Sequence, residues 1–144
     1  MSESYQATCV AIGGRGVLIE GAPGSGKSSL ALALIDRGAT LVGDDGVLLE
    51  VEGETLLASP HQNIAGLLEV RNVGLLTWPT AARVPVALVL RLDREPQRYV
   101  EGAEQVTRAG IGLPLIRLWP DSPVLALRAE LALARHGLPV DITD

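Results

Sequence analysis

Apolar and polar positions along the chain divide it into short strands and two helices. Apolar runs at 7–12 and 17–20, separated by glycines, predict two strands joined by a turn at 13–16. Within 27–37, apolar residues recur at positions 30, 31, 34 and 35, and Gly38 follows. That spacing predicts a helix that ends at the glycine.

The rest of the pattern continues this alternation. Val84–Leu92 is the most continuous run of β-branched and apolar residues, which predicts a central strand. The apolar residues Leu125, Ala129, Leu131 and Leu133 predict one face of a second helix over 123–136. Further strands are expected at 40–42, 47–51, 55–58 and 113–118. The polar segment 93–110 is interpreted either as a mobile flap or as plain surface.

Composition narrows the function classes. At 144 residues one domain, 1–144, is expected, and its 47% apolar content without Phe requires a core of Leu, Val, Ala and Ile. A net charge of −5 argues against a broad nucleic-acid surface. The single cysteine, Cys9, excludes an internal disulfide and is expected to be buried. Without a signal-peptide pattern or a long apolar stretch, a soluble cytoplasmic domain with no membrane partner is expected.

A glycine-rich motif lies between the second predicted strand and the first helix. Residues 21–28 read GAPGSGKS, which fits the G-x-x-x-x-G-K-S phosphate-binding loop, and Lys27 is the only lysine in the chain. Such a loop points backbone N–H groups at phosphate oxygens, while the lysine neutralises them and the serine hydroxyl reaches Mg²⁺. The candidate nucleotide-binding residues are Gly21, Ala22, Pro23, Gly24, Ser25, Gly26, Lys27, Ser28 and Ser29.

Two acidic positions follow the motif. Asp44 and Asp45 close the strand after the loop helix, where they could hold Mg²⁺ or accept a proton from a hydroxyl, although Asp44-Asp45-Gly46 also fits an ordinary turn. Glu69 and Arg71 would share one face of a strand. They could reach metal and phosphate, or form a surface ion pair of little consequence.

These motifs together resemble the catalytic domain of the HPr kinase/phosphorylase family. The similarity rests on the GKS loop, the following LALALIDRG helix end, the LVGDD string and LEVRNVG at 68–74, and it covers roughly the first half of the chain. It is strongest to short forms without the family's N-terminal domain. The resemblance implies a phosphoenolpyruvate-carboxykinase-like α/β fold, with a central mixed sheet flanked by helices.

The resemblance also implies a function. It implies a protein serine kinase that uses ATP and Mg²⁺ to phosphorylate the phosphocarrier protein HPr, with a reverse phosphorolysis, and it hints at a homo-oligomer. By position, Asp44 would be the base, with Lys27, Arg71 and Arg98 as the other catalytic residues. Ser28, Asp45 and Glu69 would hold the metal.

The chain also departs from the family pattern. Gln6 stands near the position of a family histidine, Ser29 replaces an acidic residue after the GKS, and the segment after the signature is shortened to 75–83. Glutamine cannot titrate near neutral pH, so a proton-handling role at that position is lost. These departures motivate a second hypothesis, an ATP-binding regulatory module with weak or no kinase activity.

Overall fold

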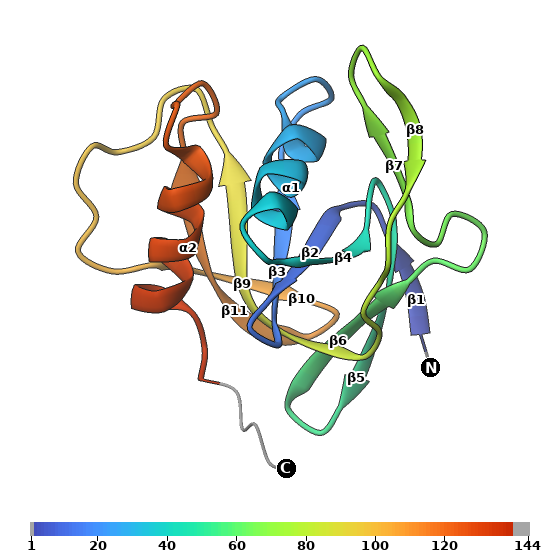
Figure 1. Ribbon diagram of the computed structural model, residues 1–144. Coiled ribbons are helices and arrows are strands. Elements are labelled where there is room, and N and C mark those ends of the chain that lie inside the picture. Colours follow the sequence, from blue (N-terminus) through green and yellow to red (C-terminus); the bar gives the residue numbers. More distant parts are fainter. Residues whose placement is uncertain (1, 140–144) are drawn as a thin grey trace.

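The computed structural model describes residues 2–139, so residues 1 and 140–144 of the expected 1–144 domain lie outside the described residues. The described part forms two helices, a nine-stranded mixed sheet and a separate two-stranded hairpin (Figure 1). The sheet strands are β1 (Ser2–Tyr5), β2 (Thr8–Ile12), β3 (Arg15–Glu20), β4 (Thr40–Gly43), β5 (Val47–Glu52), β6 (Thr55–Pro60), β9 (Val84–Leu92), β10 (Glu104–Arg108) and β11 (Ile111–Leu118). The hairpin is β7 (Leu67–Val70) with β8 (Gly74–Thr77), and the helices are α1 (Lys27–Asp36) and α2 (Leu125–His136).

The predicted central strand is confirmed. One edge of β9 pairs in parallel with β3. Its other edge pairs first with β6, antiparallel at Val84 and Pro85, and then in parallel with β11 from Val89 onward. The sheet therefore branches at β9 into one arm of β6, β5 and β1 and another of β11 and β10, while β2 and β4 extend the β3 side.

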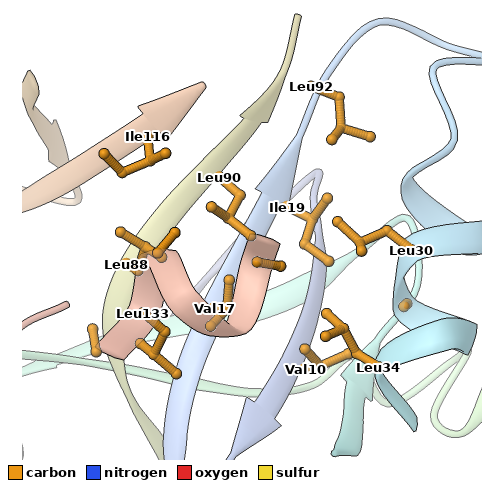
Figure 2. Close-up of a cluster of buried hydrophobic side chains, with 14 of the residues drawn as sticks. Val10, Val17, Ile19, Leu30, Leu34, Leu88, Leu90, Leu92, Ile116 and Leu133 are labelled. Carbon is orange, nitrogen blue, oxygen red and sulfur yellow. The ribbon is translucent and has the colours of Figure 1, made fainter. Parts of the chain in front are cut away.

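Both helices pack on one face of this sheet. Figure 2 shows Leu30 and Leu34 of α1 and Leu133 of α2 against side chains of the central strands. The alternation of strand residues sends the sheet's contribution to this cluster from every second position, such as Val17 and Ile19 of β3. These side chains are almost fully removed from water, and their burial is the main force that holds the helices in place.

The opposite face has no helix in the described residues. Its cluster joins Leu18 of β3 and Val89 of β9 to Leu49 of β5 and Leu56 of β6. The sheet curls, so that its own β5–β6 arm covers this face. The mixed sheet with flanking helices is as predicted, and both helices of the described residues lie on the same side of it.

Two other expectations need correction. In α2 the buried residues are Ala129, Ala132 and Leu133, whereas Leu131 is 58% exposed. Leu131 lies two residues before Leu133, which is about 200° around a helix, so both cannot face the sheet. The polar segment 93–110 contains strand β10, antiparallel to β11, which the sequence pattern did not predict. Neither helix in residues 2–139 is long and apolar enough to cross a membrane.

Candidate active site

A cleft of about 600 Å³ opens beside the carboxyl ends of β3 and β9. In α/β sheets, ligands bind at this edge of the parallel strands. The cleft collects side chains and backbone from five separate stretches of sequence: Tyr5, Gln6, Thr8, Glu20, Gly21, Pro23, Gly24, Gly26, Lys27, Ser28, Ser29, Asp44, Asp45, Glu69, Arg71 and Arg91. The structure therefore brings together the acidic pair, the Glu69/Arg71 pair and the glycine-rich motif, of which Ala22 and Ser25 alone are not in the lining.

The glycine-rich motif forms the loop between β3 and α1. Gly24 and Gly26 have φ angles of 78° and 104°, in the left-handed region that favours glycine. Lys27 donates from Nζ to the carbonyl oxygens of Gly21, at 2.9 Å, and Ala22, at 3.3 Å. The Lys27 ammonium is thus held over its own loop, within the cleft.

The start of α1 presents donors, and its own first turn contributes no carboxylate. Its N-cap residue, Gly26, makes no side-chain capping bond, and the first turn contains no acidic residue. The Leu30 amide is bonded to Gly26 O at 2.9 Å, so the N–H groups before it face outward from the helix end. Among the described residues, Ser25 Oγ is buried without a hydrogen-bond partner. These features match a site for an anion such as a phosphate.

The acidic pair follows β4 with two different environments. Asp44 Oδ1 accepts hydrogen bonds from Ser28 Oγ at 2.7 Å and from the buried Thr8 Oγ1 at 3.0 Å. Asp45 has a φ of 57° and accepts a long 3.5 Å bond from Gln6 Nε2. The turn interpretation and the functional interpretation are therefore compatible, because both residues of the turn line the cleft and Asp44 is bonded to Ser28 of α1.

Glu69 and Arg71 reach the cleft from the β7–β8 hairpin. Leu68 of β7 is buried in the core, while Glu69 is exposed on the opposite side of the strand. Arg71 lies just beyond the end of β7, in the turn before β8, so the two charges do not share a strand face as expected. Both line the cleft, and no ion pair joins them among the described contacts.

Arg98 is not placed with the others. It lies in the segment between β9 and β10 and is not among the residues that line the cleft. Arg91 of β9 is in the lining instead.

The sequence pattern also did not predict a network of ion pairs and hydrogen bonds around Glu20, at the end of β3. Glu20 is 7% exposed, and Arg108 of β10 donates to both of its carboxylate oxygens, Nε to Oε2 at 2.9 Å and Nη2 to Oε1 at 2.8 Å. The Tyr5 hydroxyl donates to Oε2, and Arg91 lies 3.6 Å from Oε1. The sequence feature that could have indicated this network is Glu20 itself, an acidic residue at the end of an otherwise apolar strand.

The network shifts the titration of its members. Burial alone would raise the pKa of Glu20, but hydrogen bonds from Arg108 and Tyr5 outweigh it, and the pKa of Glu20 is lowered. The pKa of Arg108 is raised by its bond to Glu20. Burial and the neighbouring carboxylate raise the pKa of Tyr5. Glu20 is therefore ionised at neutral pH.

No group of three or more His, Cys, Asp or Glu side chains in residues 2–139 is arranged to hold a metal ion. A dedicated protein cage for a cation is thus missing from the described part of the chain. Mg²⁺ in phosphate-transfer sites takes one or two carboxylates and completes its shell with water and phosphate oxygens. Ser28, Asp45 and Glu69 all line the cleft and fit that mode.

Comparison with known proteins gives consistent results. Residues 1–81 match the HPr Serine kinase C-terminal domain. The HPr kinase/phosphorylase of Chlorobaculum tepidum is 32% identical over 91% of this chain and 43% of its own length. That of Streptococcus equi subsp. zooepidemicus is 33% identical over 80% of this chain and 41% of its own. The chain therefore spans less than half the length of these relatives.

A solved structure agrees with these relatives. The structure of the Hpr(Ser) kinase/phosphatase from Coxiella burnetii superposes with a TM-score of 0.81 at 28% identity. It covers 92% of this chain, and 88% of that chain is covered in return.

Proposed function

This chain belongs to the HPr serine kinase C-terminal domain family, and we propose that it is an ATP-dependent kinase that phosphorylates a serine of the phosphocarrier protein HPr. The observation that carries the proposal is the cleft. There, the glycine-rich loop, its lysine and the acid pair lie together at the carboxyl ends of two parallel strands. We propose that residues 1–144 act as one catalytic domain with a phosphoenolpyruvate-carboxykinase-like fold.

The loop would bind the phosphates of ATP. Its outward N–H groups and the uncapped start of α1 are donors that match phosphate oxygens. Lys27 would exchange its loop carbonyl partners for phosphate oxygens, which are stronger acceptors because they are charged. Bound Mg²⁺ would neutralise developing charge on the phosphates, and Ser28, Asp45 and Glu69 would hold it.

Asp44 would act as the base. Its Oδ1 is occupied by Ser28 and Thr8 hydroxyls, which fix the orientation of the carboxylate. No bond to Oδ2 is recorded among the described contacts, so this oxygen would take the proton of the acceptor serine as it attacks in line. Arg71, exposed at the cleft, would stabilise the spreading charge.

The reverse activity, phosphorolysis, is also part of the proposal. Gln6 is the residue that bears on this activity. The Gln6 amide faces Asp45 at 3.5 Å, in the cleft, and carries no proton that it can give up near neutral pH. We propose that phosphoryl transfer to HPr is the dominant direction in this protein. Because its donor would be ATP, a cytoplasmic nucleotide, we also propose a cytoplasmic location.

A labelling assay tests the function. Purified protein, Mg²⁺, γ-labelled ATP and HPr from the same organism are mixed, with Lys27→Ala as the control variant. Label on an HPr serine that disappears with Lys27→Ala supports the kinase. Retained ATP binding without any label would favour the ATP-binding regulatory module, for which the Gln6 and Ser29 departures are the observations in its favour.

A further inference from the structure

The Glu20 carboxylate, at the edge of the cleft, lies close to two arginines, Arg108 and Arg91. Glu20 receives two hydrogen bonds from Arg108 and one from Tyr5, which together satisfy most of the acceptor sites of its oxygens. Arg91 is a third neighbour at the longer distance of 3.6 Å. Glu20 and the two arginines therefore have one negative and two positive charges. Asp93 is a second carboxylate near Arg91, since Arg91 helps to lower its pKa, but Asp93 is itself paired with Arg117. Arg91 is thus the arginine of this cluster without a hydrogen-bonded carboxylate among the described contacts.

The Arg91 guanidinium is exposed to the cleft. The Arg91 side chain is 45% exposed, whereas that of Arg108 is 20% exposed, and of these two arginines Arg91 is the one that lines the cleft. Arg91 therefore retains donors that Glu20 does not use, since a guanidinium carries five N–H groups.

The position of Arg91 is fixed by the sheet. Glu20 and Arg91 are register partners on the parallel strands β3 and β9, and Glu20 directly precedes the glycine-rich loop. Arg91 thus stands one strand away from the loop, at the same edge of the sheet. A side chain there lines the same cleft as the loop, so both can contact one bound ligand.

We propose that Arg91 binds the terminal phosphate of the nucleotide, with Glu20, Arg108 and Tyr5 as the residues that position its guanidinium. This inference rests on ATP binding by the cleft, as proposed above, and gives Arg91 a place in the cleft that Arg98 does not have. A buried carboxylate beside a phosphate site would repel the ligand if it were unpaired, and the bidentate bond from Arg108 removes that repulsion.

The test compares two nucleotides on four variants. Dissociation constants for Mg·ATP and Mg·ADP are measured by calorimetry on wild type, Arg91→Gln and Arg91→Lys. Arg128→Gln, an exposed arginine of α2 outside the cleft lining, is the matched control, and Arg98→Gln tests the competing assignment. If Arg91 contacts the terminal phosphate, Arg91→Gln weakens Mg·ATP by roughly 10-fold or more, in the range of a lost charge-assisted bond, and leaves Mg·ADP unchanged. Arg91→Lys recovers part of the loss, and Arg128→Gln matches wild type.

Other results overturn the assignment. Unchanged Mg·ATP affinity in Arg91→Gln removes Arg91 from the phosphate site, and equal losses for both nucleotides place it at the inner phosphates or the nucleoside. A loss confined to Arg98→Gln returns the role to Arg98. These measurements need no HPr, so they are decided separately from the kinase proposal: absence of HPr labelling would refute the kinase proposal and leave this one standing.

The positioning role of Glu20 has its own readout. Glu20→Gln keeps the size of the side chain and removes its charge, so Arg91 loses its anchor. If Glu20 acts through Arg91, Glu20→Gln weakens Mg·ATP more than Mg·ADP in the wild-type background and has no such effect when combined with Arg91→Gln. Equal effects in both backgrounds would mean that Glu20 supports the fold only.

Discussion

Replacing Glu20 with alanine tests how much the buried network contributes to stability. The change removes the acceptor of three hydrogen bonds and leaves the Arg108 guanidinium, 20% exposed, without its partner carboxylate. Breaking a fully buried ion pair costs about 3–5 kcal/mol, mainly because a charge stays buried and unpaired. Here water reaches both arginines, so the expected loss is about 2–3 kcal/mol in the free energy of unfolding.

The assay is urea denaturation at pH 7, followed by a thermal melt in which the loss appears as a fall of roughly 5–10 °C in Tm. Glu52→Ala is the matched control, because Glu52 pairs with Arg83 on the surface and its side chain is 66% exposed. An exposed pair contributes about 0–1 kcal/mol. If Glu20→Ala destabilises the protein no more than Glu52→Ala, the network does not stabilise the fold as described.

Three further predictions use other parts of the structure. As the pH falls below about 4.5, the ordinary pKa of a glutamate, wild type loses stability faster than Glu20→Ala. The reason is that Glu20, whose pKa is lowered in the folded protein, stabilises the fold only while it is ionised. Free energies of unfolding measured from pH 3 to 7 check this. Leu34→Ala in α1 costs about 2–5 kcal/mol by denaturation, since Leu34 is fully buried between helix and sheet. Cys9 resists a thiol reagent at pH 8 in the folded protein and reacts after unfolding, because burial raises the pKa of its thiol to about 12.

Local sequence was enough for the elements that carry the loop. β2, β3, α1 and β4 were predicted within a residue or two, because apolar alternation, glycine turns and helical spacing all agree over 7–43. The candidate cleft residues from these elements lie together, as expected for side chains at one edge of a sheet.

Local sequence failed where partners are distant. Strand β10 has only Val106 and Arg108 partly covered, so it lacks the apolar alternation that marks a strand, and its pairing with β11 decides its conformation. The Glu20–Arg108 pair joins residues 88 positions apart, and no periodicity predicts such a contact. The contact between Arg91 and Glu20 also joins residues far apart in sequence, and the pattern places Arg91 only within an apolar strand.

The most direct test of the kinase account is the rate of phosphoryl transfer to HPr by Asp44→Asn, measured alongside its affinity for Mg·ATP. Asparagine can still accept the hydrogen bonds from Ser28 and Thr8, so the fold and nucleotide affinity should be retained. Loss of the base should lower the transfer rate by about 10²–10⁴-fold. Near-wild-type transfer by Asp44→Asn would contradict the account, because the cleft would then work without the residue at its chemical centre.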